Sequence, residues 1–447
     1  MKDFQSIYVP VGAPTFHLES AQKEFEKSIE LLKKFDPDVV VPKEMLLGVD
    51  LLESFLEGLH PDLIVFQDIT FANNAFMLEV LRRYPEVPIL LWTMREPVID
   101  GGRLRLNSLT GAFSAANAVR MFGTNPMEYI YGAAEEEQVV RKVEATYKAA
   151  MLKKSLKSLK ISQIGHTPQG FGFGRALDTE MLQNFGVRLD SIEARELIDK
   201  AKSFSDDDIK DYLEKAKGSI KGLDETPEKN RLDFARLYRA YDEYVKANGI
   251  GALSSRCWPD FFTAFGTPVC AVLAMLNDMG VAAACEADTY GALSMHIGQV
   301  LSGSPVFFGD PVSLNEEDNT IYFWHCGTAA CSLAREDTGA CAGVHCNRKI
   351  GPTLEFGCKA SEKATVYRIG REYDGTFRAF IAKGEILDMP QQFLGTSLVF
   401  KAEGNAEEII YGAVQDGWEP HFVVIYGDVA DELQILSNML DIPADRY

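Results

Sequence analysis

Cysteine is absent from the first 256 residues of this 447-residue chain, and all eight cysteines lie from Cys257 onward. Six of them fall in or beside apolar or small-residue stretches, so we interpret them as reduced core thiols rather than disulfides. Long apolar runs are also absent, since none approaches the ~20 residues that span a bilayer. The N-terminus has no signal-type apolar core. We therefore expect a cytoplasmic protein without a membrane partner.

Basic residues are in deficit, because 45 Lys and Arg stand against 65 Asp and Glu and give a formal net charge of −20. A surface of this sign repels phosphate backbones, so nucleic acid is not an expected partner. The charge says little about a small substrate, since a local basic pocket can exist inside an acidic protein. The 46% hydrophobic and 25% charged residues are typical of a soluble globular chain.

The first part of the chain alternates short apolar runs with stretches of helical periodicity. The runs predict strands at 6–12, 38–42, 61–70 and 87–94, and the periodic stretches predict helices at 21–35 and 73–84. This alternation predicts right-handed βαβ units around a parallel sheet. A charged helix at 135–159 closes this N-terminal α/β domain, for which we predict residues 1–159.

A second α/β series follows, and then the pattern changes. Residues 160–304 are predicted to form a second parallel-sheet, Rossmann-like α/β domain. From about residue 305, short strands separated by Gly and Asp turns predict an antiparallel β-rich, barrel-like domain at 305–447, with a strong hairpin signal in "EYDGTF" (372–377). The predicted fold class is therefore α/β, with two parallel-sheet domains followed by a β-barrel-like domain.

Two acidic residues end predicted strands. Glu286 comes directly after the apolar run 281–285, and Asp310 ends the next apolar run, "PVFFGD". Either one alone could be a solvated strand end. Ligands of open parallel sheets, however, gather at the carboxyl ends of strands. Because neighbouring strands would bring these carboxylates together, we identify Glu286 and Asp310 as candidate catalytic residues.

Two of the seven histidines lie at strand ends in the same region. His325 follows the run "IYFW", and His421 opens "HFVVIYGD". Two carboxylates and two imidazoles suit a divalent cation such as Mn²⁺ (or Mg²⁺ or Co²⁺), with room left for substrate oxygens. We therefore predict a metal site formed by Glu286, Asp310, His325 and His421. A structural role for each histidine is the alternative.

These residues and their surroundings resemble the L-fucose isomerase and L-arabinose isomerase superfamily, and more closely the fucose isomerase type. "CEADTYGA" resembles the segment with the first metal-binding glutamate, and "IGHTPQGFGFG" resembles the opening of the second domain. Asp310 matches the aspartate of fucose isomerases rather than the glutamate of arabinose isomerases. The stretch "LNSLTGAFS" (106–114) departs from a sugar-contacting stretch of arabinose isomerases, so a divergent substrate is expected.

The resemblance implies a metal-dependent aldose–ketose isomerase, an intramolecular oxidoreductase of carbohydrate metabolism. Its substrate would be a pentose, a 6-deoxyhexose or a 6-modified hexose, converted through an enediolate by proton transfer at Glu286 and Asp310. A hydride shift is the mechanistic alternative. An anionic sugar of the sulfoquinovose type is the alternative substrate, with Arg95, Arg175 or Arg256 as anion contacts. The family also implies a homo-oligomer, a trimer or hexamer, with sites near subunit contacts.

Four further residues are candidate sugar contacts. His17 follows the first predicted strand, and Trp92 lies near the end of the strand at 87–94. Arg256 and Trp258 lie at the end of a strand of the second α/β domain. Each has a plainer interpretation, such as packing for Trp92 and an ion pair for Arg256.

Two alternatives belong to other functional classes. One is a non-catalytic sugar-binding or sensory protein built on two α/β lobes. The other is a zinc or thiol protein that uses Cys326, Cys331, Cys341, His345 and Cys346. The two Cys-x4-Cys gaps in that set fit zinc ligation poorly.

Overall fold

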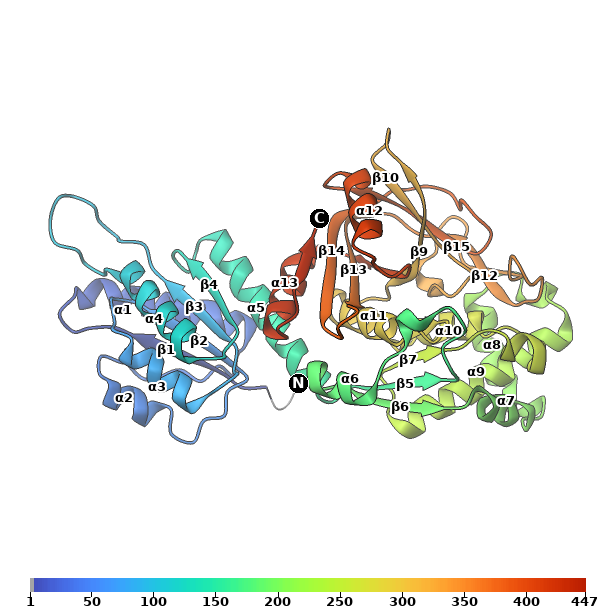
Figure 1. The fold of residues 1–447 in the computed structure, drawn as a ribbon, viewed down its shortest axis with the longest axis horizontal. Helices are drawn as coiled ribbons and strands as arrows, with labels where there is room; N and C mark the ends of the chain where they lie inside the picture. Colours follow the sequence, from blue (N-terminus) through green and yellow to red (C-terminus); the bar gives the residue numbers. More distant parts are fainter. Residues whose placement is uncertain (1–3) are drawn as a thin grey trace. The chain divides into compact units, whose positions relative to one another are not determined.

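The computed structural model describes residues 4–447, which form two compact units (Figure 1). The first unit takes the residues up to Ser155 together with Asp431–Asp441, and the second takes Leu156–Ala430 and Ile442–Tyr447. The second unit thus holds both the second parallel sheet and the barrel. Within the described residues, no helix is long and apolar enough to cross a membrane.

The first unit is built on a parallel four-stranded sheet in the order β1-β2-β3-β4. Its strands are β1 (Ser6–Val11), β2 (Leu63–Asp68), β3 (Ile89–Thr93) and β4 (Met127–Tyr131). Every residue of β1, β2 and β3 is buried, as expected for parallel strands whose two faces are both covered by helices. The helices are α1 (Leu18–Phe35), α2 (Val49–Phe55), α3 (Ala75–Arg83), α4 (Ser108–Phe122), α5 (Glu137–Leu156) and α13 (Ala430–Met439).

Helix α13 joins the first unit from the far end of the sequence. Its Asn438 donates to Glu128 Oε1 at 2.7 Å, and its Glu432 pairs with Lys148 of α5 at 3.5 Å. No local sequence pattern indicates this placement, because α13 follows directly after a strand of the second unit.

One predicted strand of the first unit does not form. Residues 38–42 contribute only an isolated parallel bridge between Val40 and Ile7. Pro42 has no N–H with which to extend this pairing. The sheet is completed instead by β4, which the sequence patterns did not predict.

The second unit begins with another parallel four-stranded sheet, in the order β6-β5-β7-β8. Its strands are β5 (Lys160–Ile164), β6 (Arg188–Ile192), β7 (Ala252–Ser255) and β8 (Ala282–Cys285). Its helices are α6 (Asp178–Phe185), α7 (Ala194–Lys202), α8 (Lys210–Ser219), α9 (Glu228–Asn248), α10 (Cys270–Asp278) and α11 (Thr289–Ser302). The strand before Glu286, β8, is fully buried at one edge of this sheet.

Six antiparallel strands of the second unit close into a barrel, in the order β15-β10-β9-β16-β13-β14, because β14 also pairs with β15. They are β9 (Phe307–Asn315), β10 (Thr320–His325), β13 (Ser361–Arg371), β14 (Phe377–Ile386), β15 (Thr396–Ala402) and β16 (Phe422–Tyr426). The accessory strands and helix are β11 (Cys341–Gly343), β12 (Thr353–Gly357), β17 (Ala444–Arg446) and α12 (Ala406–Gln415). The predicted hairpin at 372–377 joins β13 to β14, and the predicted fold class is confirmed.

The barrel register gathers three candidate residues. Strand β9 lies between β10 and β16. Asp310 lies opposite Trp324, and Gly309 lies opposite Phe422. Trp324 and Phe422 are the direct chain neighbours of the two candidate histidines, so both histidines come beside Asp310.

Helix α11 brings the second parallel sheet to the barrel. Its Ser294 Oγ accepts a hydrogen bond from Ile369 N of β13 at 2.9 Å. A Cβ at Gly291 would lie 2.6 Å from the ring of Phe308, so only glycine permits this approach to β9. The close packing sets the carboxyl end of β8 against the strands that carry the other candidate residues.

Candidate active site

Glu286 lies in the tight turn between β8 and α11. Glu286 and Ala287 both have positive φ angles, 59° and 53°, in the left-handed region that costs a non-glycine residue about 1–2 kcal/mol. Ala287 N donates to Ser255 O at 3.1 Å, and Asp288 N donates to Cys285 O at 3.2 Å. These bonds fix the Glu286 carboxylate just beyond the end of β8, as predicted.

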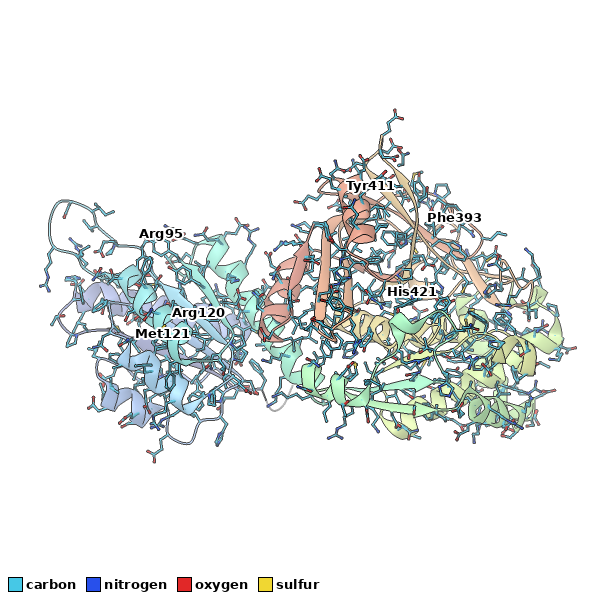
Figure 2. All side chains as sticks on the ribbon, viewed as in Figure 1. Arg95, Arg120, Met121, Phe393, Tyr411 and His421 are labelled. Carbon is cyan, nitrogen blue, oxygen red and sulfur yellow. The ribbon has the colours of Figure 1, made fainter. Side chains whose placement is uncertain are left out.

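His421, which immediately precedes β16, is the centre of the site (Figure 2). Its Nε2 lies 3.0 Å from Glu286 Oε2 and 3.6 Å from Asp310 Oδ1, and its Nδ1 lies 2.9 Å from Asp288 Oδ2. Burial alone would lower the His421 pKa, but hydrogen bonds with Asp288 and Glu286 raise it to about 10. Both candidate catalytic carboxylates therefore converge on one imidazole nitrogen.

Asp288 connects His421 to Arg368, a fully buried arginine of β13. Asp288 Oδ1 caps α11 by accepting from Gly291 N at 2.9 Å. Its two oxygens also accept from Arg368 at 2.5 and 3.1 Å. Burial would raise the Asp288 pKa, but Arg368 and His421 hold it below its usual range. The ionised Asp288 thus orients His421 so that Nε2 faces Glu286 and Asp310.

Asp310 and His325 complete the group. A ring nitrogen of His325 and ligand atoms of Glu286 and His421 all lie within 4.8 Å of one another. Burial raises the pKa of Asp310. Burial would lower the His325 pKa, but the neighbouring Cys326, Asp310 and Glu286 raise it. The structure therefore gathers all four residues that the sequence predicted as metal ligands.

Aromatic rings cover His421. The ring centroids of Phe308, Phe173 and Phe171 lie 4.9, 5.5 and 6.4 Å from that of His421. Phe171 also contacts Trp258, edge to face at 6.2 Å. These rings lower the local dielectric constant, which strengthens the electrostatic interactions of the imidazole.

Arg256 and Trp258 lie in the same unit as this group. Arg256 Nε donates to Trp258 O at 3.1 Å and pairs with Asp260 at 2.8 Å. The guanidinium of Arg348 lies 5.3 Å from the centroid of the Trp258 ring. Trp258 therefore lies between Arg348 and the aromatic cover of His421, while Arg256 is engaged in an ion pair.

The other two candidate sugar contacts lie in the first unit. His17 is exposed and caps α1, where its Nδ1 accepts from Ser20 N at 3.3 Å. Trp92 is fully buried in β3, and its indole N–H donates to Gly132 O at 2.8 Å. Burial gives Trp92 a packing role in this unit, and a sugar contact by His17 stays a prediction.

The zinc set suggested by cysteine spacing is not assembled. Among residues 4–447, the close groups of metal-binding side chains contain none of Cys331, Cys341, His345 and Cys346. Cys326 lies instead beside Cys270, Cys285 and His325. The Cys-x4-Cys gaps therefore do not form a site.

Arg368 and the orienting role of Asp288 had not been predicted. A signal was available, because Arg368 interrupts an apolar stretch, "TVYRIG" (365–370), and a buried charge requires a partner. The sequence alone could not pair it with a residue 80 positions earlier.

No protein-family model matches the chain. The curated proteins that it resembles, however, are all sulfoquinovose isomerases. Sulfoquinovose isomerase of Clostridium sp. (strain MSTE9) is 59% identical over 447 residues, 100% of both chains. Sulfoquinovose isomerase of Priestia aryabhattai is 36% identical over 451 residues, again 100% of both chains. That of Alkalicoccus urumqiensis is 35% identical over 445 residues, 98% of both chains.

These full-length similarities confirm the predicted enzyme class and overturn the alternative of a non-catalytic sensory protein. The broader resemblance to fucose and arabinose isomerases stays a prediction. The chain belongs to the sulfoquinovose isomerase family and is an aldose–ketose sugar isomerase.

Proposed function

We propose that the protein is a divalent-cation-dependent isomerase that interconverts an anionic 6-substituted aldose of the sulfoquinovose type and its ketose. The observation that carries the proposal is the convergence of Glu286 and Asp310 on His421 Nε2, in a member of a family whose relatives are sulfoquinovose isomerases. The anionic substrate, an alternative at the level of sequence, is favoured over a pentose or 6-deoxyhexose.

The donor set fits a hard divalent cation. Carboxylate oxygens and imidazole nitrogens are suitable ligands for Mn²⁺, and Mg²⁺ or Co²⁺ would accept the same set. Nε2 of His421 faces both carboxylates, so a cation bound to this nitrogen would meet the same partners. Such a cation would polarise the sugar carbonyl and stabilise negative charge on the enediolate oxygen.

The protein's own groups supply the proton transfer and its setting. Glu286 and Asp310 are placed to act as general base and acid on adjacent carbons. Asp310 is suited to carrying a proton because burial raises its pKa. Asp288 and Arg368 hold the His421 ring, and the phenylalanine cover keeps water from one side of it.

Arg348 is the best candidate for binding the anionic group. Its exposed guanidinium lies 5.3 Å from the centroids of both Trp258 and Phe262. No carboxylate of the described residues lies within 4 Å of it. Arg256 and Arg95, by contrast, each pair with a carboxylate at 2.8 Å. A stacked guanidinium with free N–H donors suits a sulfonate.

The test measures ketose formation from sulfoquinovose, glucose and L-fucose by enzyme that has been stripped with EDTA. We expect turnover of sulfoquinovose only after Mn²⁺ is restored. Arg348→Gln should raise KM for sulfoquinovose roughly tenfold or more, the effect of losing one charged hydrogen bond. Arg335→Gln, which removes a guanidinium paired with Asp337 and Asp388, is the control. Full activity in EDTA would contradict the metal requirement, and equal turnover of glucose would contradict the anionic substrate.

A homo-oligomer, a trimer or hexamer, is also proposed. Helix α4 exposes Leu109, Phe113, Met121 and Phe122 by 43, 75, 78 and 59%, and Figure 2 labels Met121 on this helix. Exposed apolar groups of this size are typical of interaction surfaces. Phe113→Glu should lower the molar mass measured by light scattering, and an unchanged mass would contradict a subunit contact at α4.

A further inference from the structure

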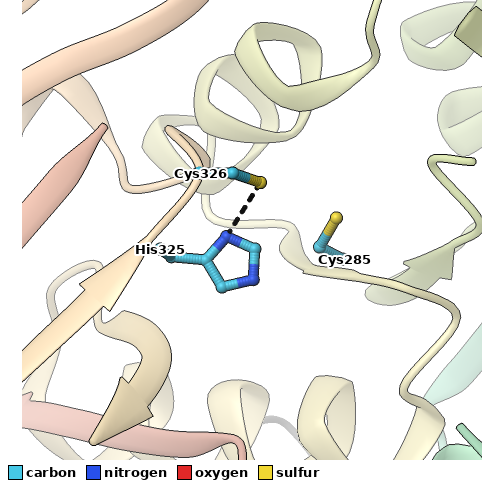
Figure 3. Close-up of side chains that lie close together, drawn as sticks. All are labelled: Cys285, His325 and Cys326. Atoms are coloured by element: carbon cyan, nitrogen blue, oxygen red, sulfur yellow. Dashed lines mark hydrogen bonds between the residues drawn. The ribbon is translucent and has the colours of Figure 1, made fainter. Parts of the chain in front are cut away.

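His325 has a second set of neighbours, made of thiols. Its Nδ1 lies 3.3 Å from Cys326 Sγ (Figure 3). A ring nitrogen of His325 and the Sγ atoms of Cys285 and Cys326 all lie within 4.8 Å of one another. Cys270 Sγ is 3.8 Å from Cys326 Sγ. We call Cys270, Cys285, Cys326 and His325 the thiol–histidine cluster.

Two separations in this cluster match those between ligands around a tetrahedral cation. With Zn–S bonds of about 2.3 Å and Zn–N bonds of about 2.0–2.1 Å, neighbouring donors lie about 3.5 Å apart for N and S and about 3.8 Å apart for two S atoms. The observed separations are 3.3 Å from His325 Nδ1 to Cys326 Sγ and 3.8 Å from Cys326 Sγ to Cys270 Sγ. Cys285 Sγ lies within 4.8 Å of both Cys326 Sγ and a ring nitrogen of His325.

The ligand chemistry of the cluster also differs from that of the candidate site around Glu286 and Asp310. All three cysteines and His325 are buried, by 92% or more. Two thiolates would balance the charge of a divalent cation at this depth, where an unpaired charge is costly. Thiolate donors select thiophilic metals, whereas the oxygen-rich group of Glu286 and Asp310 selects harder ones.

We propose that the thiol–histidine cluster is a second metal site, selective for a thiophilic divalent cation such as Zn²⁺. Nδ1 of His325 belongs to this site, and Nε2 is the nitrogen left for Glu286 and His421. The imidazole therefore lies between a soft site and a hard one. The second site does not depend on the proposed function, because its ligands are recognised by their own spectroscopy rather than by turnover.

The experiment titrates Co²⁺ into full-length, metal-free, reduced protein and records its absorption spectrum. We expect a near-ultraviolet thiolate-to-cobalt charge-transfer band and intense visible bands of a four-coordinate ion, both removed by added Zn²⁺. Cys326→Ser should lose the charge-transfer band. Glu286→Gln should keep it, which separates this site from the oxygen-rich one.

Cys331→Ser is the matched control, because Cys331 lies outside the cluster and should leave the band unchanged. If circular dichroism shows that Cys326→Ser does not fold, Cys285→Ser and Cys270→Ser replace it, and each should weaken the band. Absence of the band in fully reduced wild-type protein would overturn the proposal. A band that survives all the cluster substitutions would also overturn it.

Discussion

The two parallel sheets both have a strand followed or ended by a carboxylate, yet only one of these carboxylates lies beside the other candidate site residues. Glu286, after β8, lies 3.0 Å from His421. Asp68, at the end of β2, is 1% exposed, and its Oδ2 accepts no hydrogen bond from any of the described residues. Burial raises the Asp68 pKa well above its usual range. A Cβ at Gly111 of α4 would lie 2.6 Å from Asp68 Cγ, so helix α4 covers the Asp68 carboxyl. Glu286, by contrast, faces the barrel.

An acid at a strand end therefore becomes a candidate site only when another element brings complementary groups to it. In the second unit, that element is the barrel, which supplies Asp310, His325 and His421. Substitutions at the two strand ends and at their neighbours should therefore differ in their effect on turnover.

Replacing Glu286 should have the largest effect. Glu286→Gln keeps the size of the side chain but removes the carboxylate, so kcat should fall by roughly 10²–10⁴-fold, the usual contribution of a general base. Asp68→Asn is the matched variant from the other sheet and should leave kcat unchanged. Steady-state kinetics measure both. Similar losses in the two variants would contradict the distinction between the two strand ends.

Asp288→Asn should have the next largest effect. Asn still caps α11, but it no longer holds His421 as a carboxylate does, so Mn²⁺ affinity or kcat should fall about 10–100-fold. Titration calorimetry with Mn²⁺ separates this effect from lost stability. Asp242→Asn, which removes a buried acid paired with Lys246 at 2.6 Å, should lower stability without changing Mn²⁺ affinity. Equal affinity in all three proteins would show that Asp288 only caps the helix.

The two tryptophans should respond in different measurements. Trp92→Phe loses the hydrogen bond to Gly132 O and some buried volume. The free energy of unfolding should therefore fall by about 1–3 kcal/mol, with KM unchanged. Trp258→Phe weakens the stack under Arg348, so KM for sulfoquinovose should rise a few-fold. Denaturant unfolding and initial rates distinguish them. A change of KM in Trp92→Phe alone would place the sugar contact in the first unit.

Asp68→Asn should alter only stability, and in a pH-dependent way. Because the folded-state pKa of Asp68 is raised, its carboxyl stabilises the fold most below its unfolded pKa, and this contribution declines as the pH rises toward the folded value. The thermal midpoint of the variant should therefore rise relative to that of the wild type as the pH increases from 5 to 8. A constant difference in midpoint across this range would contradict the raised pKa.

Much of the fold could be predicted because local patterns determine it. Buried parallel strands appear as apolar runs, and the Asp-Gly turn predicts the hairpin of β13 and β14. Three of the four candidate ligands were also predictable from strand ends, because Glu286 directly follows β8, His325 ends β10 and His421 directly precedes β16. Asp310 was predicted to end a strand, but it lies within β9, which continues to Asn315. The placement of α13, the single bridge at Val40 and the Asp288–Arg368 pair depend on long-range packing, for which neither periodicity nor spacing carries information.

The order β10-β9-β16 around the barrel has a further consequence for how the chain can vary. His325 and His421 flank Asp310 in space, although 95 residues separate the two histidines along the chain. The intervening segment includes the exposed tip of the β13–β14 hairpin, which lies outside the ligand group. The candidate site therefore depends on which strands are neighbours in the barrel rather than on the continuity of the chain between them.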